Sequence, residues 1–212
     1  MSSDILRALS PLPETAAELN TVAKLLGVER TTLLLGAQAS EANLRTLPLH
    51  EYRLLYFATH GLLPGELRCQ AEPGLVLSPP GGQATRRDHD GLLDASEIAA
   101  MKLNADLVVL SACNTAGGGR LGGEALTGLA ESFFFAGARS LVVSHWQVPS
   151  AATAQLMGTM FGRLGPELKG GASAALKEAQ AQMISQQKTA HPFFWAAFVV
   201  IGDGIAVPRG DP

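Results

Sequence analysis

Two residues that could carry out chemistry, His60 and Cys113, each follow a short apolar run. The run 107–110 is typical of a strand buried on both faces, and the run 54–58 has the same character. Open α/β sheets place their sites at the carboxyl ends of such strands. If the two strands are parallel and adjacent, the sequence predicts that the histidine and the cysteine lie side by side above the sheet.

A histidine beside a cysteine can take the thiol proton and stabilise the thiolate near neutral pH. The chemistry expected of this pair is therefore nucleophilic hydrolysis, with Cys113 as nucleophile and His60 as base. Gly61 leaves its own N–H unobstructed, so this N–H and that of Cys113 could hold a developing oxyanion. A lone cysteine is more often a structural residue, and it is the position of Cys113 at a strand end that favours catalysis.

The bulk properties exclude several classes of protein. At 212 residues, with 47% hydrophobic and 17% charged residues, the chain is expected to form a folded globular domain. A net charge of −3 and the absence of a basic stripe argue against a nucleic-acid partner. Two cysteines exclude a disulfide framework and fit a reducing compartment. The sequence shows neither a signal peptide nor an apolar run of membrane length, so we expect a cytoplasmic protein without a membrane partner.

Helix-like and strand-like segments alternate along the chain. The spacing of apolar residues, the capping residues and the glycine stops predict helices over 13–26, 40–47, 94–101, 123–135, 150–164 and 172–187. The expected strands are 31–35, 52–58, 75–77, 107–110, 138–144 and 195–201. Residues 62–91, rich in proline and glycine, are otherwise expected to form a long loop. This alternation predicts an α/β fold with a mostly parallel sheet and helices on both faces.

Expected caps complete the helix assignments. Ser40 and Ser150 are predicted to cap the helices that follow them, and Asp94 with Glu97 has the spacing of a capping box.

Several segments share a specific pattern with one known family. They are Phe-Ala-Thr-His-Gly at 57–61, Asp-Gly-Leu-Leu at 90–93, Ala-Ser-Glu-Ile at 95–98, Leu-Val-Val-Leu-Ser-Ala-Cys at 107–113, Gly-Ala-Arg-Ser at 137–140, Trp146, and the stretch from Trp195 to Asp203. In these segments the sequence resembles the CHAT family, caspase-like domains associated with tetratricopeptide repeats, within the caspase and separase clan of cysteine peptidases. Cys113 follows His60 by 53 residues, close to the roughly 50 residues that separate this pair in caspases.

The resemblance implies a caspase-like three-layer sandwich and a Cys–His dyad without a required third carboxylate. It implies an endopeptidase that cleaves a protein substrate and acts within a larger signalling or defence assembly. The peptidase domain is expected over residues 13–204, with residues 1–12 as an N-terminal extension and 205–212 as a C-terminal tail. A tetratricopeptide-repeat protein or another regulatory protein is an expected partner, and no cofactor or metal is expected.

Substrate contacts are expected from three further residues. His145 and Trp146 end another predicted strand, and Asn114 follows the nucleophile. The chain departs from the family pattern at Asn114, where a glutamate is usual, and after Trp146, where one or two aspartates are usual. The segment after Trp146 therefore lacks the acidic residues that, in the family, would favour an arginine or lysine of the substrate before the scissile bond.

Three alternatives remain open. The same fold could serve as a catalytically silent interaction or signalling module. Gly117, Gly119 and Gly122 match a dinucleotide fingerprint, but three residues separate them from Cys113 and no carboxylate follows about 20 residues later. His60, Cys69, His89 and Cys113 could in principle bind zinc, although no pair has the short spacing of structural zinc sites.

Overall fold

The chain is described here from a computed structural model. The description covers residues 3–67, 70–81, 89–111, 122–146, 148–168 and 170–204, and leaves out the side chains of residues 3–4 and 122–127.

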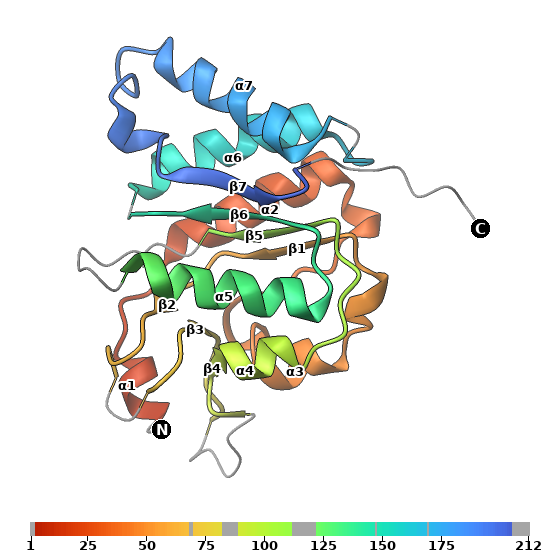
Figure 1. Ribbon diagram of the computed structural model, residues 1–212, viewed down its shortest axis with the longest axis vertical. Coiled ribbons are helices and arrows are strands. Elements are labelled where there is room, and N and C mark those ends of the chain that lie inside the picture. The colour runs from red at the N-terminus through yellow and green to blue at the C-terminus, as the bar shows by residue number, and fades with distance from the viewer. Residues whose placement is uncertain are drawn as a thin grey trace.

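The centre of the fold is a four-stranded sheet (Figure 1). Its order is β1 (Leu54–Phe57), β5 (Leu107–Leu110), β6 (Ser140–Ser144) and β7 (Phe198–Gly202). The first three strands are parallel and β7 runs antiparallel at one edge. The expected mostly parallel sheet is confirmed, and so is the expectation that β1 and β5 are parallel neighbours.

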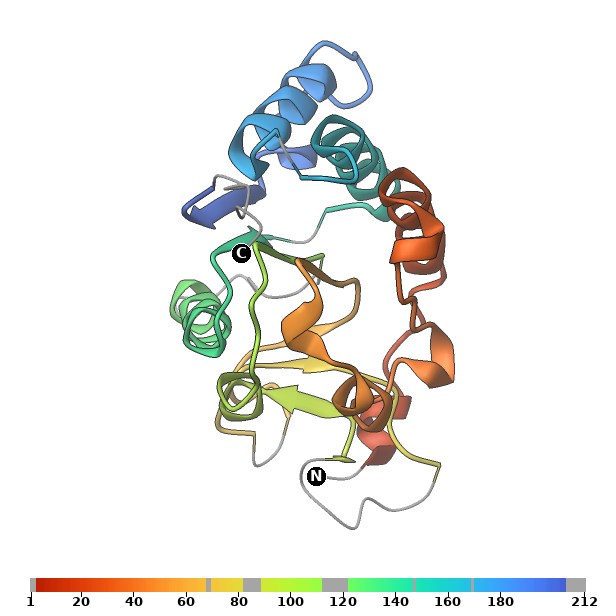
Figure 2. The same cartoon turned by 90° about the vertical axis from the view of Figure 1, so that its right-hand side faces the viewer.

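Helices cover both faces of this sheet (Figure 2). The α-helices are α1 (Ser3–Arg7), α2 (Pro13–Leu26), α3 (Glu41–Thr46), α4 (Ala95–Ala99), α5 (Gly122–Ala136), α6 (Ser150–Leu164) and α7 (Ala172–Ile184). Short 3-10 helices are η1 (Val28–Arg30), η2 (Gly36–Gln38), η3 (Leu49–Glu51) and η5 (Pro192–Phe194). Side chains alternate along a strand, so Val108 packs on the α5 side while Val109 packs on the α6 and α7 side. Both valines are fully buried, which explains why the sequence of β5 is apolar throughout.

A second, smaller sheet is formed by strands within and at the two ends of region 62–91, which apart from a strand at 75–77 was expected to be a loop. It is antiparallel, in the order β2 (Gly61–Leu62), β3 (Gly74–Val76) and β4 (Leu92–Asp94). The prediction of a strand over 75–77 found β3, whereas β2 and β4 are too short to show an alternating pattern. The predicted capping box is confirmed where β4 enters α4, because the Asp94 carboxylate accepts the Glu97 N–H at 2.9 Å.

Two local predictions are wrong. Residues 31–35 have extended backbone, with φ −121° and ψ 126° at Thr31, but pair with no strand in the described part of the chain. Their β-branched and apolar side chains favour an extended chain, yet a strand also needs a partner edge. Ser150 does not cap α6, since it is the first helical residue and Pro149 occupies the N-cap position without a side-chain hydrogen bond.

A buried carboxyl group fastens α3 to the small sheet. The Glu41 side chain is 2% exposed, accepts the Gly91 N–H at 2.6 Å and lies 3.8 Å from the Arg45 guanidinium. Arg45 also pairs with Glu97 at 2.8 Å. Burial is the main reason that the pKa of Glu41 is raised to about 7, and the nearby acidic groups add to the effect.

Glu41 should make the free energy of unfolding depend on pH. Its pKa is about 7 in the folded chain against an ordinary 4.5, so the folded state holds more protons between these values. Stability from this group is therefore present below about pH 4.5 and falls, by up to about 3 kcal/mol, as the pH rises through 7. Glu41→Gln, which keeps an acceptor for Gly91 but cannot ionise, should reduce this fall in urea unfolding at pH 5 and pH 8. Glu51→Gln, at an exposed position, is the control, and an equal fall in both variants would contradict the assignment.

Gly137, which ends α5, should tolerate no side chain. Its φ is +112°, and an added Cβ would lie 2.4 Å from the Leu103 carbonyl oxygen. Gly137→Ala is expected to lower the free energy of unfolding by roughly 2 kcal/mol or more. Gly162→Ala, inside α6 with open space around the new methyl group, should raise it by about 0.5–1 kcal/mol. Changes of the same sign, measured by urea unfolding, would show that the glycine conformations are misassigned.

Candidate active site

The candidate residues that the structure describes follow the carboxyl ends of parallel strands, at one edge of the four-stranded sheet. His60 follows β1, Ser111 follows β5, and His145 and Trp146 follow β6 at its carboxyl end (Figure 1). Cys113, with Asn114 after it, lies outside the described residues, and the description reaches Ser111 in that stretch.

The register of β1 and β5 allows the sequence positions of His60 and Cys113 to be compared. Phe57 and Leu110 are partners across the ladder, and the Ser111 N–H donates to the Phe57 carbonyl at 2.9 Å. His60 stands three positions after Phe57 and Cys113 three positions after Leu110. The two chain segments that carry these residues therefore leave the sheet from neighbouring strands at matched positions.

The His60 side chain is oriented by a backbone carbonyl. Its Nε2 lies 2.8 Å from the Ser10 oxygen. A carbonyl oxygen can only accept, so in the neutral ring Nε2 carries the proton and Nδ1 keeps the lone pair. The main chain of His60 is also fixed, because its carbonyl accepts the Val76 N–H from β3 at 2.8 Å. Sequence reasoning missed Ser10, since a contact made by a backbone carbonyl needs no particular side chain.

Gly61 directs its N–H away from the small sheet. The bond between Val76 N–H and His60 C=O makes those two residues a hydrogen-bonded pair. Pairs alternate in an antiparallel ladder, so the next pair, Gly61 with Leu75, is not hydrogen-bonded and the Gly61 N–H points away from β3. Because β2 is the outer strand of this sheet, that N–H faces the open edge.

His145 and Trp146 share the edge but do not lie next to His60. They follow β6, which is separated from β1 by β5, a lateral offset of about 10 Å at the usual strand spacing. The His145 side chain is exposed, whereas Trp146 is half-buried and its Nε1–H donates to the Phe193 carbonyl at 3.0 Å.

A cavity of about 280 Å³ lies at the end of β5. Ser111, Glu18 of α2 and Thr153 of α6 line it with polar atoms, while Pro149 and Phe193 supply apolar surface. Glu18 is 4% exposed and its carboxylate accepts the Tyr56 hydroxyl. Burial raises the pKa of Glu18, while the hydroxyl groups of Tyr56 and Ser111 act in the opposite direction.

Glu18 was not identified from the sequence. A signal was present, because this acidic residue stands four positions before Val22 and so shares its buried helix face.

The zinc and dinucleotide hypotheses concern residues of which the structure describes only a part. In the part of the chain described, no group of three or more His, Cys, Asp or Glu side chains is placed to hold a metal ion. Of the four residues considered for zinc, Cys69 and Cys113 lie outside the description, as do Gly117 and Gly119 of the glycine pattern. None of the described helices is long and apolar enough to span a membrane.

The chain is similar to one protein family and to two curated proteins. A family model described as CHAT domain matches residues 3–203. Tetratricopeptide repeat protein 28 of Mus musculus is 28% identical over 223 aligned residues, which cover 92% of this chain and 9% of the mouse protein. The protein of the same name from Homo sapiens is 33% identical over 114 residues, which cover 54% of this chain and 4% of the human protein. The chain thus spans less than a tenth of the length of these curated relatives.

The hydrogen bond between Tyr56 and Glu18 should contribute measurably to stability. Tyr56→Phe leaves a buried carboxyl group without this donor and should lower the free energy of unfolding by about 1–3 kcal/mol. Tyr52→Phe is the matched control, because the Tyr52 hydroxyl is bonded to the exposed Thr32 hydroxyl at 2.6 Å and loss of this bond should cost less. A double-mutant cycle with Glu18→Gln, followed by urea unfolding, measures the coupling. Zero coupling would mean that the bond is not formed in solution.

Proposed function

This chain belongs to the CHAT domain family, and we propose that it is a cysteine endopeptidase in which Cys113 attacks a peptide carbonyl and His60 moves the protons. The observation that carries the proposal is the orientation of His60. The Ser10 carbonyl holds Nε2 at 2.8 Å, which leaves Nδ1 as the basic nitrogen, at the edge of the sheet from which the segment of Cys113 departs.

The architecture supports the same conclusion. A mostly parallel sheet with helices on both faces is compatible with a caspase-like three-layer sandwich. Phe57 and Leu110 are partners across the ladder, and His60 and Cys113 each stand three positions later in the sequence, which supports pairing them as base and nucleophile.

The proposed reaction proceeds in two halves. His60 Nδ1 takes the thiol proton, the thiolate adds to the carbonyl carbon, and the oxygen becomes an oxyanion held by the N–H groups of Gly61 and Cys113. The imidazolium then gives its proton to the leaving amine as the peptide bond breaks, which leaves a thioester. Water attacks the thioester with His60 again as base, and the acid and the free thiol are released. The Ser10 carbonyl replaces a third carboxylate in orienting the ring.

A protein substrate would lie in extended form along this edge. The cavity of about 280 Å³ at the end of β5 is the proposed place for one substrate side chain, with His145, Trp146 and Asn114 as further contacts. Such a substrate would be presented by a larger assembly. A tetratricopeptide-repeat module is a proposed regulatory partner, since both curated relatives carry that repeat in their names.

The second candidate is a catalytically silent module of the same family. Membership in the family supports both functions. The presence of His60 and Cys113, together with the orientation of the imidazole, favours the enzyme.

Labelling with a thiol-reactive peptide electrophile tests the dyad. Cys113 should be labelled faster than Cys69, as measured by mass spectrometry of the digested protein, because the proposal assigns His60 as its base. His60→Ala should slow the labelling of Cys113 by about 100-fold or more. His50→Ala is the matched control, since its imidazole is exposed on η3, and should leave the rate unchanged.

Two results would refute the endopeptidase. One is equal labelling of Cys113 and Cys69. The other is labelling of Cys113 that is insensitive to His60→Ala while the variant keeps its circular dichroism spectrum. Both would favour the silent module.

A further inference from the structure

The segment before α2 crosses the small sheet and ends on the His60 imidazole. Helix α1 lies beside that sheet (Figure 1), and its Leu6 side chain is 4% exposed. Leu6 belongs to a buried apolar cluster that includes a residue from each strand of the small sheet, and Leu9 packs against this cluster. The strand residues of the cluster are Leu62, Val76 and Leu92. We call residues 5–12 the N-terminal strap.

The strap is anchored at two further points. The Arg7 guanidinium donates to the carbonyl of Pro80, in the chain that follows β3. At the other end of the strap, the Leu12 carbonyl accepts the N–H and the hydroxyl of Thr15, at 3.2 and 2.7 Å, and this joins it to the first turn of α2. Pro11 lies between these anchors, and its fixed φ limits the freedom of the link.

The Ser10 carbonyl lies between the anchors and contacts the imidazole. Its oxygen is 2.8 Å from His60 Nε2, and Ser10 itself is exposed. One such hydrogen bond contributes about 0.5–1.5 kcal/mol, whereas fixing the backbone of a single residue costs about 1–2 kcal/mol. The bond alone is therefore too weak to order the strap. It forms because Leu6, Leu9 and the junction with α2 already hold the chain in place.

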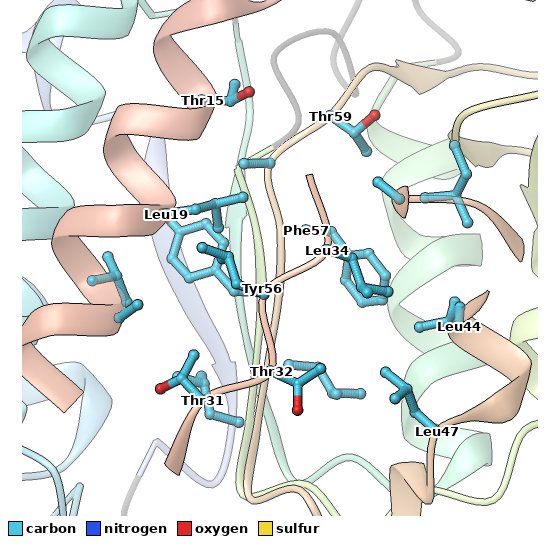
Figure 3. A pocket seen from close by; sticks show the side chains of 18 of the residues that line it. Thr15, Leu19, Thr31, Thr32, Leu34, Leu44, Leu47, Tyr56, Phe57 and Thr59 are labelled. Atoms are coloured by element: carbon cyan, nitrogen blue, oxygen red, sulfur yellow. The ribbon is translucent and has the colours of Figure 1, made fainter. Parts of the chain in front are cut away.

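The small sheet also holds the main chain of His60. Val76, a member of the apolar cluster, donates its N–H to the His60 carbonyl at 2.8 Å, and its own carbonyl accepts the Thr59 hydroxyl. Thr59 after β1 and Thr15 in α2 line one cavity of about 720 Å³ (Figure 3). The main chain and the side chain of the histidine are thus fixed to one unit, the small sheet with the strap packed on it.

We propose that Leu6 and Leu9 are positioning residues for His60. By anchoring the strap to the small sheet, they hold the Ser10 carbonyl at Nε2, so the ring keeps its proton there and presents the Nδ1 lone pair in a fixed direction. The inference rests on the proposed function, in which Nδ1 is the base. Detachment of α1 changes neither residue of the dyad, yet it frees the ring and lowers the rate at which Cys113 reacts.

Leu6→Asp tests the strap in the full chain, because a carboxylate buried on the small sheet is unfavourable and α1 should detach. Ile5→Asp is the matched control, since Ile5 is 42% exposed on the same helix. Leu6→Met keeps the apolar volume and should behave like the unaltered chain. Protection of the Val76 amide from hydrogen exchange shows that the small sheet stays folded in each variant. If Leu6→Asp loses this protection, Leu9→Asp, at a half-buried position next to Ser10, takes its place.

NMR relaxation of the Cε1–H group of His60 measures how firmly the ring is held. In the unaltered chain, in Ile5→Asp and in Leu6→Met, its order parameter should be that of a rigid group, about 0.8 or more. In Leu6→Asp it should fall below about 0.6, the value of a flexible group.

The labelling of Cys113 by the peptide electrophile measures the consequence for the proposed reaction. At saturating electrophile, Leu6→Asp should lower the maximal rate by about tenfold or more, because a misplaced base loses at least this much. The electrophile concentration at half-maximal rate should change by less than about twofold, since the strap acts on the reacting group and not on binding.

Three outcomes would overturn the strap. They are a ring that is equally ordered in the unaltered chain and in Leu6→Asp, equal effects of Ile5→Asp and Leu6→Asp, and, where His60→Ala slows labelling, a freed ring with an unchanged maximal rate. Where His60→Ala does not slow labelling, it is the proposed function that fails. The ring measurement needs no catalysis, so it then decides by itself whether the strap positions His60.

Discussion

The parallel pairing of β1 with β5 is the constraint on which the rest of the structure depends. It sets Phe57 opposite Leu110 and brings the ends of both strands to one edge, where Ser111 is bonded to Phe57. The same pairing makes β5 an interior strand between β1 and β6. An interior strand buries both of its faces, and this explains why helices must cover the sheet on each side.

The small antiparallel sheet has a different role, since it holds the segment that leaves β1. The His60 carbonyl is bonded to Val76 of β3, and the Thr59 hydroxyl donates to the carbonyl of that same residue. The Ser10 carbonyl then fixes the imidazole from a third direction. A histidine held in this way has lost much of its conformational freedom, which supports the proposed role of His60 as a preorganised base. The sheet also presents Gly61 with its N–H outward.

The opposite edge of β1 presents a contrast. On one side β1 pairs with β5 along its whole length, while on the other side Leu54 and Ala58 border a large cavity. The neighbouring segment 31–35 has strand-forming residues and extended backbone, yet it pairs with no strand in the described part of the chain.

Local patterns in the sequence were enough to determine the main elements. Apolar periodicity located α2 from Pro13 to Leu26, and the continuous apolar run located β5, because both signals come from residues close together in the chain. The Asp94 capping box was likewise readable from four residues. His60 and Cys113 were selected by type and position, and the parallel adjacency assumed for their strands is confirmed.

Only the tertiary structure decided which backbone groups meet. The contact between Ser10 and His60 spans 50 positions and uses a main-chain oxygen, so no residue type marks it in the sequence. Residues 31–35 show the same dependence on tertiary structure. Their side chains favour a strand, but a strand forms only where another strand lies alongside. The buried pair of Glu18 and Tyr56 also depends on how α2 packs on β1. Residue type and spacing set the elements, whereas distant packing set the environment of each candidate site residue.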